Sequence, residues 1–594
     1  MRFVFDIETD GLLDQLTTIH CIEMRHVESG KAYSFAPGRI KEAIDMLEKA
    51  TEIIGHNIIG FDIPAIQKIY PDWMPKGTIT DTLVLSQLLR GDLKNEDFDY
   101  HREYGYDWPK NLFGSHSLKA WGYRLGEHKQ EFQTDWKEWT PEMSVYCAQD
   151  VKVNLDLYKL FEQVIKDREW SQESIDLEHR AFELCNRIGN NGWTFNETKA
   201  ADLYGELARE RAKIEAELQT LFEPWEVSEW FTPKANNSKY GYVKGVPFEK
   251  KKTIEFNPQS RRHIEICLRK KYKWKPKKTT ANGHAQIDDV VLSELHYPEA
   301  KKLARMFLIN KRLGQLAEGS QAWLKLVGED KKIRHQIVPC GTVTGRASHR
   351  RPNLAQIPRA TAPYGKQCRE LFTVPDNWVL CGSDLSGIEL RMLAHYLAFT
   401  DGGAYADQIL KGDIHTFNQK AAGLDTRDQA KTYIYALCYG AGDSKMGEIV
   451  GGTAKDGKKL KEKFFQGMPA FRELQNGVQG AVSRGWLKSL DGRQVKLRSA
   501  HSALNALLQS AAGVISKKWI CLIDEEIRRK GLGGECYIMA WVHDEIQIAC
   551  KTQEVADHVG RITGRMAEKA GEAYDCRIPI QSEYSTGRTW ADSH

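Results

Sequence analysis

The sequence has 594 residues, enough for about four domains at a typical size of ~150 residues each. Its net charge of +4 is small for a chain of this length. The 12 cysteines are scattered and form no CxxC pair, so they support neither a zinc ribbon nor a disulfide framework. We therefore expect reduced thiols in a cytoplasmic protein. No signal peptide opens the chain and no run reaches the ~18 apolar residues of a membrane span, which argues against a membrane protein.

The first 165 residues alternate predicted strands with helices, and three of their segments carry acids beside apolar runs. In MRFVFDIET, a period of two places Asp6 and Glu8 on one face of a strand. HNIIGFD adds Asp62, and YCAQD adds Tyr146 and Asp150, four residues apart on a predicted helix. Four carboxylates and a tyrosine predict a two-metal nuclease site, in which the metals generate hydroxide and stabilise the leaving oxygen. Taken singly, each acid would be an ordinary surface carboxylate.

The next part of the chain is predicted to be helical and charged. ADLYGELARERAKIEAELQTLFEPW (201–225) has the pattern of a long solvent-exposed helix, and 300–325 is helical again. Between them, 226–255 is rich in Pro, Gly, Asn and Lys and is predicted to be a loop. The stretch KKYKWKPKK (270–278) interleaves lysines with aromatics, which fits either a strip that tracks nucleic-acid phosphates or a solvated loop.

TGRASHRRPNLAQIP (344–358) is a loop or ribbon punctuated by Gly and Pro, and it contains Arg346 and Asn353. Such polar side chains can probe the minor groove of a nucleic acid. Taken alone, this segment is weak evidence for binding to a nucleic acid.

Two distant segments, DLSGIELR (384–391) and VHDE (542–545), each place a carboxylate at the end of an apolar run that is predicted to be a buried strand. Burying Asp384 or Asp544 is costly unless the side chain is paired or bound to a metal. On neighbouring strands, the two acids could hold two divalent cations for in-line displacement at phosphorus. The alternative is that these are two unrelated acids at the ends of strands, which would be explanation enough if either segment stood alone.

RDQAKTYIYALCYG (427–440) is predicted to be a helix that ends at its final glycine. Arg427, Lys431, Tyr435 and Tyr439 recur every fourth residue, so one face presents two cations and then two phenolic rings. Cations suit a triphosphate, and rings suit a base or sugar to stack against. The alternative is a solvated helix with ordinary i,i+4 spacing.

In their order and spacing, the segments of 344–545 resemble the polymerase motifs of the family A (DNA polymerase I-like) DNA polymerases. GDIHTFNQ, SALNALLQSAAG and FNPQSRRHI are also similar to that family, and SGIELR and YGAGD are most similar to the replicative polymerases of short-tailed (podovirus) phages. The three acidic segments near the N-terminus resemble the DEDD 3′–5′ exonuclease superfamily, in its tyrosine subtype.

The resemblance implies an α/β and α+β multidomain chain, in which a ribonuclease H-like 3′–5′ exonuclease domain is followed by a right-hand polymerase. The implied parts are the exonuclease domain (1–165), linker helices and thumb (166–325), palm (326–396 and 501–594) and fingers (397–500). The implied activity is template-directed extension of a primer with dNTPs, with 3′–5′ proofreading and without a 5′-nuclease domain.

The resemblance also implies two Mg²⁺ ions in each of two sites, with Mn²⁺ as the alternative, because Mg²⁺ suits oxygen-rich sites and substrate phosphates. In the polymerase site, the metal ligands would be Asp384, Asp544 and the carbonyl of Leu385. In the exonuclease site, the ligands would be Asp6, Glu8, Asp62 and Asp150, with Tyr146 as a further catalytic residue.

The helix over 427–440 would then bind the incoming dNTP. Arg427, Lys431 and His415 would grip its phosphates, and Lys431 would also donate a proton to pyrophosphate. Tyr439 would stack near the template base.

Two further residues would set specificity. Glu389 would act as a steric gate against a ribose 2′-hydroxyl, and the hydroxyl of Tyr435 would permit ready incorporation of dideoxynucleotides. Minor-groove acceptors look alike in every correct base pair, so residues that contact them can check shape without reading sequence. The implied DNA contacts are Arg346, Gln509, His543, Asn353 and Asn505.

Primer–template DNA and dNTPs are the implied partners, with the phage helicase–primase and single-stranded-DNA-binding protein as further candidates in the host-cell cytoplasm. Some phage relatives carry a long thumb insertion that captures host thioredoxin. Only about 30 residues (226–255) occupy that place here, so we do not expect thioredoxin dependence.

Three other functions explain less of the sequence. A stand-alone nuclease would leave the 344–545 motifs unexplained, and a non-enzymatic DNA-binding scaffold would not need six site carboxylates. Glu389 and the editing segments argue against a phage RNA polymerase.

Overall fold

The computed structural model describes residues 1–105, 108–127, 132, 135–280 and 282–593. The chain divides into two compact units. Unit 1 comprises Met1–Trp193, Arg334–Ile357 and Thr373–His594, and unit 2 comprises Thr194–Ile333 and Pro358–Phe372.

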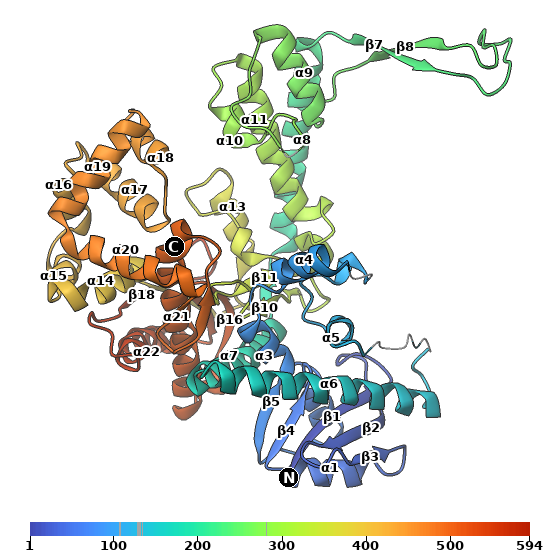
Figure 1. Ribbon diagram of the computed structural model, residues 1–594, viewed down its shortest axis with the longest axis vertical. Helices are drawn as coiled ribbons and strands as arrows, with labels where there is room; N and C mark the ends of the chain where they lie inside the picture. Colours follow the sequence, from blue (N-terminus) through green and yellow to red (C-terminus); the bar gives the residue numbers. More distant parts are fainter. Residues whose placement is uncertain (106–107, 128–131, 133–134, 281, 594) are drawn as a thin grey trace. The chain divides into compact units, whose positions relative to one another are not determined.

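The N-terminal part of unit 1 is built on a five-stranded sheet with the order β3-β2-β1-β4-β5 (Figure 1). β1 runs antiparallel to β2 and parallel to β4, and β4 is parallel to β5. The strands are β1 (Arg2–Thr9), β2 (Ile19–His26), β3 (Ala32–Phe35), β4 (Glu52–Gly55) and β5 (Thr78–Asp81). The helices are α1 (Ile40–Lys49), α2 (Asp62–Ile69), α3 (Thr82–Leu89), α4 (Leu93–Tyr104), α5 (Leu118–Leu125), α6 (Pro141–Asp167) and α7 (Gln172–Asn191).

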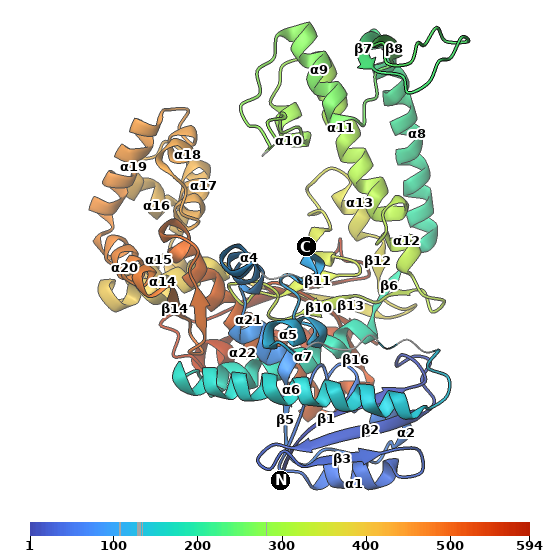
Figure 2. The same ribbon diagram turned by 45° about the vertical axis from the view of Figure 1, so that its right-hand side comes forward.

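The two faces of β1 have different partners. Phe3, Phe5 and Ile7 pack into the core on one face, whereas Val4 packs on the other face against α6. Because side chains alternate along a strand, Asp6 and Glu8 lie on the same face as Val4. The long helix α6 lies across this face (Figure 2), so it brings its own polar residues to the two acids.

A second sheet in unit 1 has the order β16-β17-β13-β18 and is antiparallel throughout. Its strands are β13 (Val379–Leu385), β16 (Cys536–Val542), β17 (Glu545–Cys550) and β18 (Ser582–Gly587). The two-residue turn His543–Asp544 joins β16 to β17. Helices that share the hydrophobic core of this sheet are α14 (Ile388–Asp401), α21 (Ala503–Arg529) and α22 (Gln553–Glu572).

Among the described residues, one helix, over Ala500–Arg529, is long and apolar enough to cross a membrane by length and composition. However, 83% of its apolar window is buried inside the protein. That burial is the environment of a core helix, which passes the same compositional test.

Between β13 and α21 lies a helical part of unit 1. Its elements are α15 (Ala404–Lys411), α16 (Ile414–Ala422), α17 (Arg427–Cys438), α18 (Asp443–Glu448), α19 (Ala454–Gly467), α20 (Pro469–Gly480), β14 (Trp486–Lys488) and β15 (Gln494–Lys496). In α17, Ala430, Tyr433, Ile434 and Leu437 are buried and form a helical stripe with the spacing i, i+3, i+4 and i+7. The opposite face is therefore left for function.

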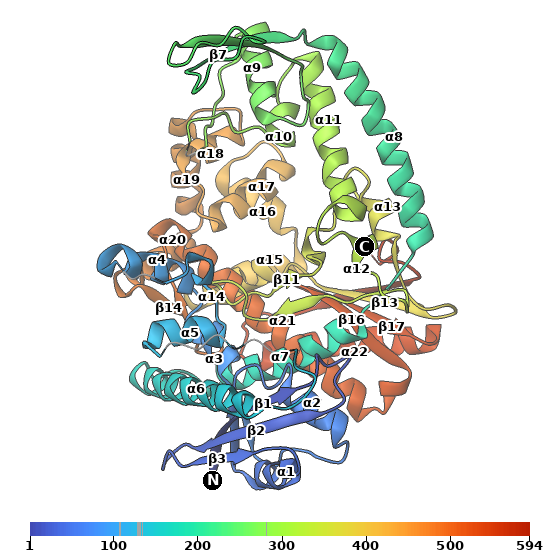
Figure 3. The same ribbon diagram turned by 90° about the vertical axis from the view of Figure 1, so that its right-hand side faces the viewer.

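Unit 2 contains two long helices, α8 (Glu197–Leu221) and α11 (Pro298–Leu313), which pack along each other (Figure 3). With them lie α9 (Arg261–Tyr272), α10 (Asp289–Ser293), β7 (Trp225–Phe231) and β8 (Phe248–Ile254). Among the described residues, the remaining strands and α-helices are β6 (Trp193–Phe195), β9 (Lys332–Ile333), β10 (Gln336–Val338), β11 (Ser348–Arg350), β12 (Phe372–Thr373), α12 (Trp323–Leu326) and α13 (Gly365–Arg369).

The prediction of a loop over 226–255 is wrong, because β7 and β8 form a regular antiparallel hairpin there. Composition favoured a loop because Gly, Pro, Asn and Lys are common in the segment. Those Pro, Gly and Asn residues lie in the connection between the strands, whereas Trp225, Trp230, Phe231 and Phe248 supply the aromatic residues that favour strands.

The basic strip 270–278 consists of the end of α9 and the loop after it. Tyr272 stacks on Tyr297 with ring centroids 4.0 Å apart, and Trp274 is buried. The lysines of the strip are exposed. The rings therefore serve packing, while contact of the lysines with phosphates stays a prediction.

Candidate active sites

Asp384 lies on β13, and Asp544 lies in the turn that leads into the neighbouring strand β17. Asp384 is near the end of β13 and pairs in register with Glu545, the residue after Asp544. The backbone N–H of Leu385 donates to the carbonyl of Asp544 at 2.9 Å. The sheet therefore brings Asp384, Leu385 and Asp544 together at one edge, as the sequence predicted.

Burial raises the pKa of the Asp544 carboxyl, while the nearby Arg346 and His543 act in the opposite direction. A carboxylate with a raised pKa is a group that a bound cation would stabilise. The donor set consists of two carboxylates and a neighbouring backbone carbonyl, all of them oxygens, so these residues fit a hard ion such as Mg²⁺.

Glu389 is held by two of the other predicted residues. Arg346 Nη2 donates to Glu389 Oε1 at 2.5 Å, and the Tyr439 hydroxyl donates to Glu389 Oε2 at 2.8 Å. Burial and the bond to Glu389 raise the pKa of Tyr439 to about 12. The predicted gate, minor-groove reader and stacking ring thus form one cluster, which sequence patterns alone could not reveal.

One face of α21 lies beside this cluster. Gly513 closely approaches Arg346, because a Cβ at Gly513 would lie 3.4 Å from Arg346 Cγ. Asn505 and Gln509 precede Gly513 by eight and four residues, so they share its face of the helix. Helical spacing therefore places Asn505 and Gln509 in one row with Gly513, which lies beside Arg346.

His543 occupies the β16–β17 turn in a left-handed conformation, with φ of 59°. Its carbonyl accepts a hydrogen bond from Ser516 of α21. Its ring meets that of His349 edge-on, with centroids 6.0 Å apart. The turn next to Asp544 is thereby fixed from two sides.

The functional face of α17 carries Arg427 and Lys431, both exposed, and the half-buried Tyr435. Burial, and then the charges of Arg427 and Lys431, lower the pKa of His415 on α16, so these three groups are neighbours as predicted. Arg427 Nε also donates to Asp413 Oδ2 at 2.7 Å, a partner that the sequence did not indicate. Asp413 caps α16 and the Arg427 guanidinium lowers the pKa of its carboxyl.

Asn353 has a local structural role. Its side-chain oxygen accepts from the N–H of Ala355 at 3.1 Å and begins a short helical turn over Leu354–Gln356. Its amide nitrogen takes no part in this bond, and a DNA contact by Asn353 stays a prediction.

A second acidic cluster lies between β1 and α6. Ligand atoms of Asp6, Glu8 and Cys147 all lie within 4.8 Å of one another. Asp62 is 3% exposed, and burial, followed by the charge of Asp6, raises the pKa of its carboxyl well above the ordinary value. Oδ1 of Asp62 has no hydrogen-bond partner among the described residues. Such a buried oxygen beside a second acid fits a site for a cation.

The remaining predicted members of this cluster come from α6. Tyr146 packs against Phe132 and Trp136, with centroids 5.5 and 6.2 Å apart. Asp150 is buried one turn further along the helix. Both residues therefore come from the helix that covers the Asp6 and Glu8 face of β1.

Two residues near the acids were not identified from the sequence pattern as part of this site. Cys147 Sγ lies 3.3 Å from the carbonyl of Asp6 and 3.5 Å from its Oδ2. Asp81 caps α3 and accepts from the backbone N–H groups of Asn57 and Ile59 at 2.8 and 3.1 Å. Asp81 thus fixes the loop that leads to Asp62.

Comparison with known proteins identifies the family of the chain. The family model "DNA polymerase family A" matches residues 244–592. The chain is 36% identical to the DNA-directed DNA polymerase of Enterobacteria phage T3 and 36% identical to that of Escherichia phage T7, in each case covering 100% of both chains. The fold is similar to that of the POL domain of Pol1 from M. smegmatis, whose structure was solved in complex with DNA primer-template and dNTP. The TM-score is 0.76 at 18% sequence identity, and the match covers 100% of this chain and 96% of that chain. The chain therefore belongs to DNA polymerase family A and is similar to the phage T7 and T3 enzymes.

Proposed function

We propose that this polymerase extends a primer by two-metal phosphoryl transfer at Asp384 and Asp544 and edits its product at a separate 3′–5′ exonuclease site. The observation that carries the proposal is the presence of two acidic clusters on two different sheets of unit 1. Divalent ions at these sites would supply the charge that activates the primer 3′-hydroxyl in one site and water in the other, and that stabilises the leaving oxygens.

The chain's own residues would bind the incoming dNTP from α17. Arg427, Lys431 and His415 are neighbours, and a triphosphate would meet all three. Because Arg427 is paired with Asp413, phosphate oxygens would compete with that carboxylate for the guanidinium. Lys431 would also give a proton to the leaving pyrophosphate.

Glu389 and Tyr435 would select the sugar. The Glu389 side chain is fixed by Arg346 and Tyr439, so it would crowd a 2′-hydroxyl from a defined position. Tyr435 is half-buried on the functional face of α17, where its hydroxyl would take the place of a missing 3′-hydroxyl.

In the exonuclease site, Asp6, Glu8, Asp62 and Asp150 would bind the metal ions, and Tyr146 would orient the attacking water. The aromatic contacts of Tyr146 with Phe132 and Trp136 would hold its ring in place for this role.

Outside the active sites, we propose that 1–165 is the exonuclease domain, that 166–325 forms the linker helices and thumb, that 326–396 and 501–594 form the palm, and that 397–500 forms the fingers. The partners would be primer–template DNA and dNTPs, with the phage helicase–primase and single-stranded-DNA-binding protein in the host cytoplasm. The hairpin β7–β8 is short, which supports action without thioredoxin.

A direct test compares wild type with Asp544→Asn in extension of a labelled primer–template with Mg²⁺ and dNTPs. We expect the variant to bind primer–template with unchanged affinity and to lose at least about 10³-fold in extension rate, because the ligand set of the metal ions is broken. Asp376→Asn, which changes an exposed acid just before β13, is the matched control and should extend normally. Extension by Asp544→Asn at the wild-type rate would overturn the assignment of the palm site.

A further inference from the structure

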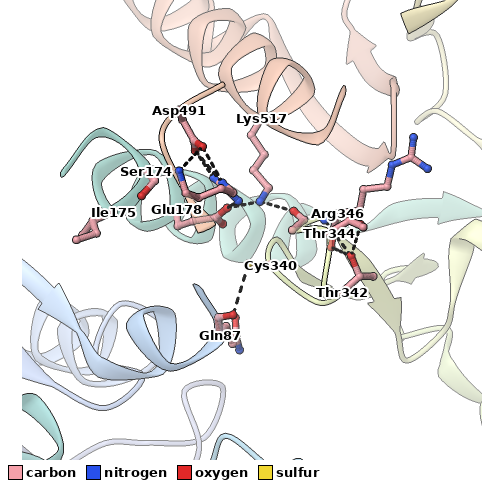
Figure 4. Close-up of polar contacts among 12 residues, drawn as sticks. Gln87, Ser174, Ile175, Glu178, Cys340, Thr342, Thr344, Arg346, Asp491 and Lys517 are labelled. Carbon is pink, nitrogen blue, oxygen red and sulfur yellow. Dashed lines mark hydrogen bonds and ion pairs between the residues drawn. The ribbon is translucent and has the colours of Figure 1, made fainter. Parts of the chain in front are cut away.

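A buried network of charged side chains lies beneath the polymerase site of unit 1 (Figure 4). Glu178 of α7 and Lys517 of α21 are 0% exposed, and Arg493 and Asp491, from the turn before β15, are almost as deeply buried. Glu178 Oε1 accepts from both Arg493 and Lys517, and Arg493 Nε donates to Asp491 Oδ2 at 2.8 Å. Two cations and two anions are thus balanced inside the protein.

Stability alone gives a weak reason for this network. Burying charges carries a desolvation cost, and replacing a buried ion pair with apolar residues of similar volume is often neutral or stabilising. Lys517 has, however, a second contact that lies outside the charged groups, because its Nζ donates to the backbone carbonyl of Gly345 at 2.6 Å. Gly345 is the residue before Arg346.

The loop at Gly345 is held between two members of the network. Gly345 has φ of +76°, and a Cβ there would lie 2.7 Å from Arg493 Nη1, so only glycine fits without displacement. In the same peptide group as the Gly345 carbonyl, the N–H of Arg346 donates to Thr342 Oγ1 at 3.0 Å. The peptide group between Gly345 and Arg346 is therefore fixed at both its oxygen and its nitrogen.

We infer that Lys517 and Glu178 are positioning residues that act through the Gly345 carbonyl to aim the Arg346 guanidinium at the primer terminus. The inference rests on the proposed minor-groove role of Arg346. Glu178 orients the Lys517 ammonium, Lys517 fixes the carbonyl, and the fixed backbone sets where the Arg346 side chain leaves the loop. Its guanidinium then reaches Glu389, and its Cγ lies beside Gly513 of α21.

The test uses two primers that differ in one minor-groove acceptor. One primer ends in deoxyguanosine, and the other ends in 3-deazadeoxyguanosine, which lacks N3. The single-turnover rate of dNTP addition is measured on each primer for wild type, Arg346→Ala and Lys517→Met. Lys518→Met is the control, because Lys518 is the residue next to Lys517 and its Nζ lies 3.8 Å from Oε1 of a different acid, Glu173.

We expect wild type and Lys518→Met to lose about 10-fold or more on the analogue, the value of one well-placed hydrogen bond. Arg346→Ala should be slow on both primers and insensitive to the analogue. Lys517→Met should be slower than wild type by about 10-fold on the ordinary primer and should have lost most of its sensitivity to the analogue, because Arg346 is present but misplaced.

Each other outcome has a definite meaning. If Lys517→Met is slowed equally on both primers and keeps the wild-type sensitivity, its role is only structural and the inference fails. If wild type itself ignores the analogue, the minor-groove role of Arg346 fails, and the positioning role fails with it, while the metal site at Asp544 is untouched.

Two further variants keep the test usable if Lys517→Met does not fold. Lys517→Arg retains a charge and donors, so it should restore part of the sensitivity. Gly345→Ala leaves every buried charge in place but displaces the same loop, so it should reproduce the loss of sensitivity. Wild-type sensitivity in Gly345→Ala would also overturn the inference.

Discussion

At the scale of single residues, the polymerase site depends on side chains that hold one another. Glu389 has a defined position because Arg346 and Tyr439 donate to its two oxygens. A side chain that is already held in place can exclude a ribose 2′-hydroxyl without losing conformational entropy when the nucleotide binds. Tyr435 lies half-buried on α17, and its contact with the sugar is the proposal that the next variant tests.

Tyr435→Phe should restore discrimination against dideoxynucleotides by on the order of 10²-fold, because removing the hydroxyl removes the group that replaces the 3′-hydroxyl of the sugar. Competition between dNTP and ddNTP in primer extension measures the ratio. Tyr433→Phe is the control, since Tyr433 is buried on the opposite side of the same helix. Equal discrimination by wild type and Tyr435→Phe would show that Tyr435 does not contact the sugar.

Asp544→Asn should raise the midpoint of thermal unfolding when Mg²⁺ is removed with EDTA. Burial raises the pKa of Asp544, so the charged form is disfavoured in the folded protein relative to the unfolded chain. The native state therefore loses stability as pH rises through the ordinary carboxyl pKa and then the raised one, and an uncharged amide avoids that loss. A lower midpoint for Asp544→Asn than for Asp376→Asn at neutral pH would contradict this.

At the scale of elements, α17 separates packing from function by its two faces. One stripe is buried, and the other carries Arg427, Lys431 and Tyr435. The helix begins at a capping box, in which Thr426 Oγ1 accepts from the Gln429 N–H at 3.2 Å and the Gln429 side chain accepts from the Thr426 N–H at 3.1 Å. Arg427 is the first residue after the cap, so its position depends on the cap.

Thr426→Ala should destabilise the protein by about 1 kcal/mol, the typical value of an N-cap residue. It should also raise KM for dNTP more than it lowers kcat, because a frayed first turn loosens the Arg427 contact with phosphate. Steady-state kinetics and thermal unfolding measure the two effects. Thr432→Ala, which changes an exposed threonine within the same helix, should leave KM unchanged. An equal rise of KM in both variants would show that the N-cap does not position Arg427.

At the scale of the whole molecule, the sequence predicted the two acidic clusters because each acid follows an apolar run, and a strand or helix then fixes which face it occupies. It could not predict partners that come from distant segments. Asp413 beside Arg427, Cys147 beside Asp6, and Lys517 on the Gly345 carbonyl all depend on tertiary packing.

In two segments, the average amino-acid composition concealed how individual residues are placed. Gly, Pro, Asn and Lys suggested a loop over 226–255, yet the paired strands β7 and β8 occupy both ends of the segment. The lysines and aromatics of the basic strip suggested either a strip that tracks phosphates or a solvated loop, yet Trp274 is buried and Tyr272 stacks on Tyr297. In the first segment, average composition concealed two paired strands, and in the second it concealed two packed rings.

The most direct test of two separate sites in one chain is a labelled primer–template assay with Mg²⁺, with and without dNTPs, on wild type, Asp544→Asn and Asp6→Ala/Glu8→Ala. We predict that wild type both extends and degrades, that Asp544→Asn only degrades the primer from its 3′ end, and that the double variant only extends. If Asp6→Ala/Glu8→Ala degrades the primer at the wild-type rate, or if Asp544→Asn still extends it, the account of the two sites is contradicted.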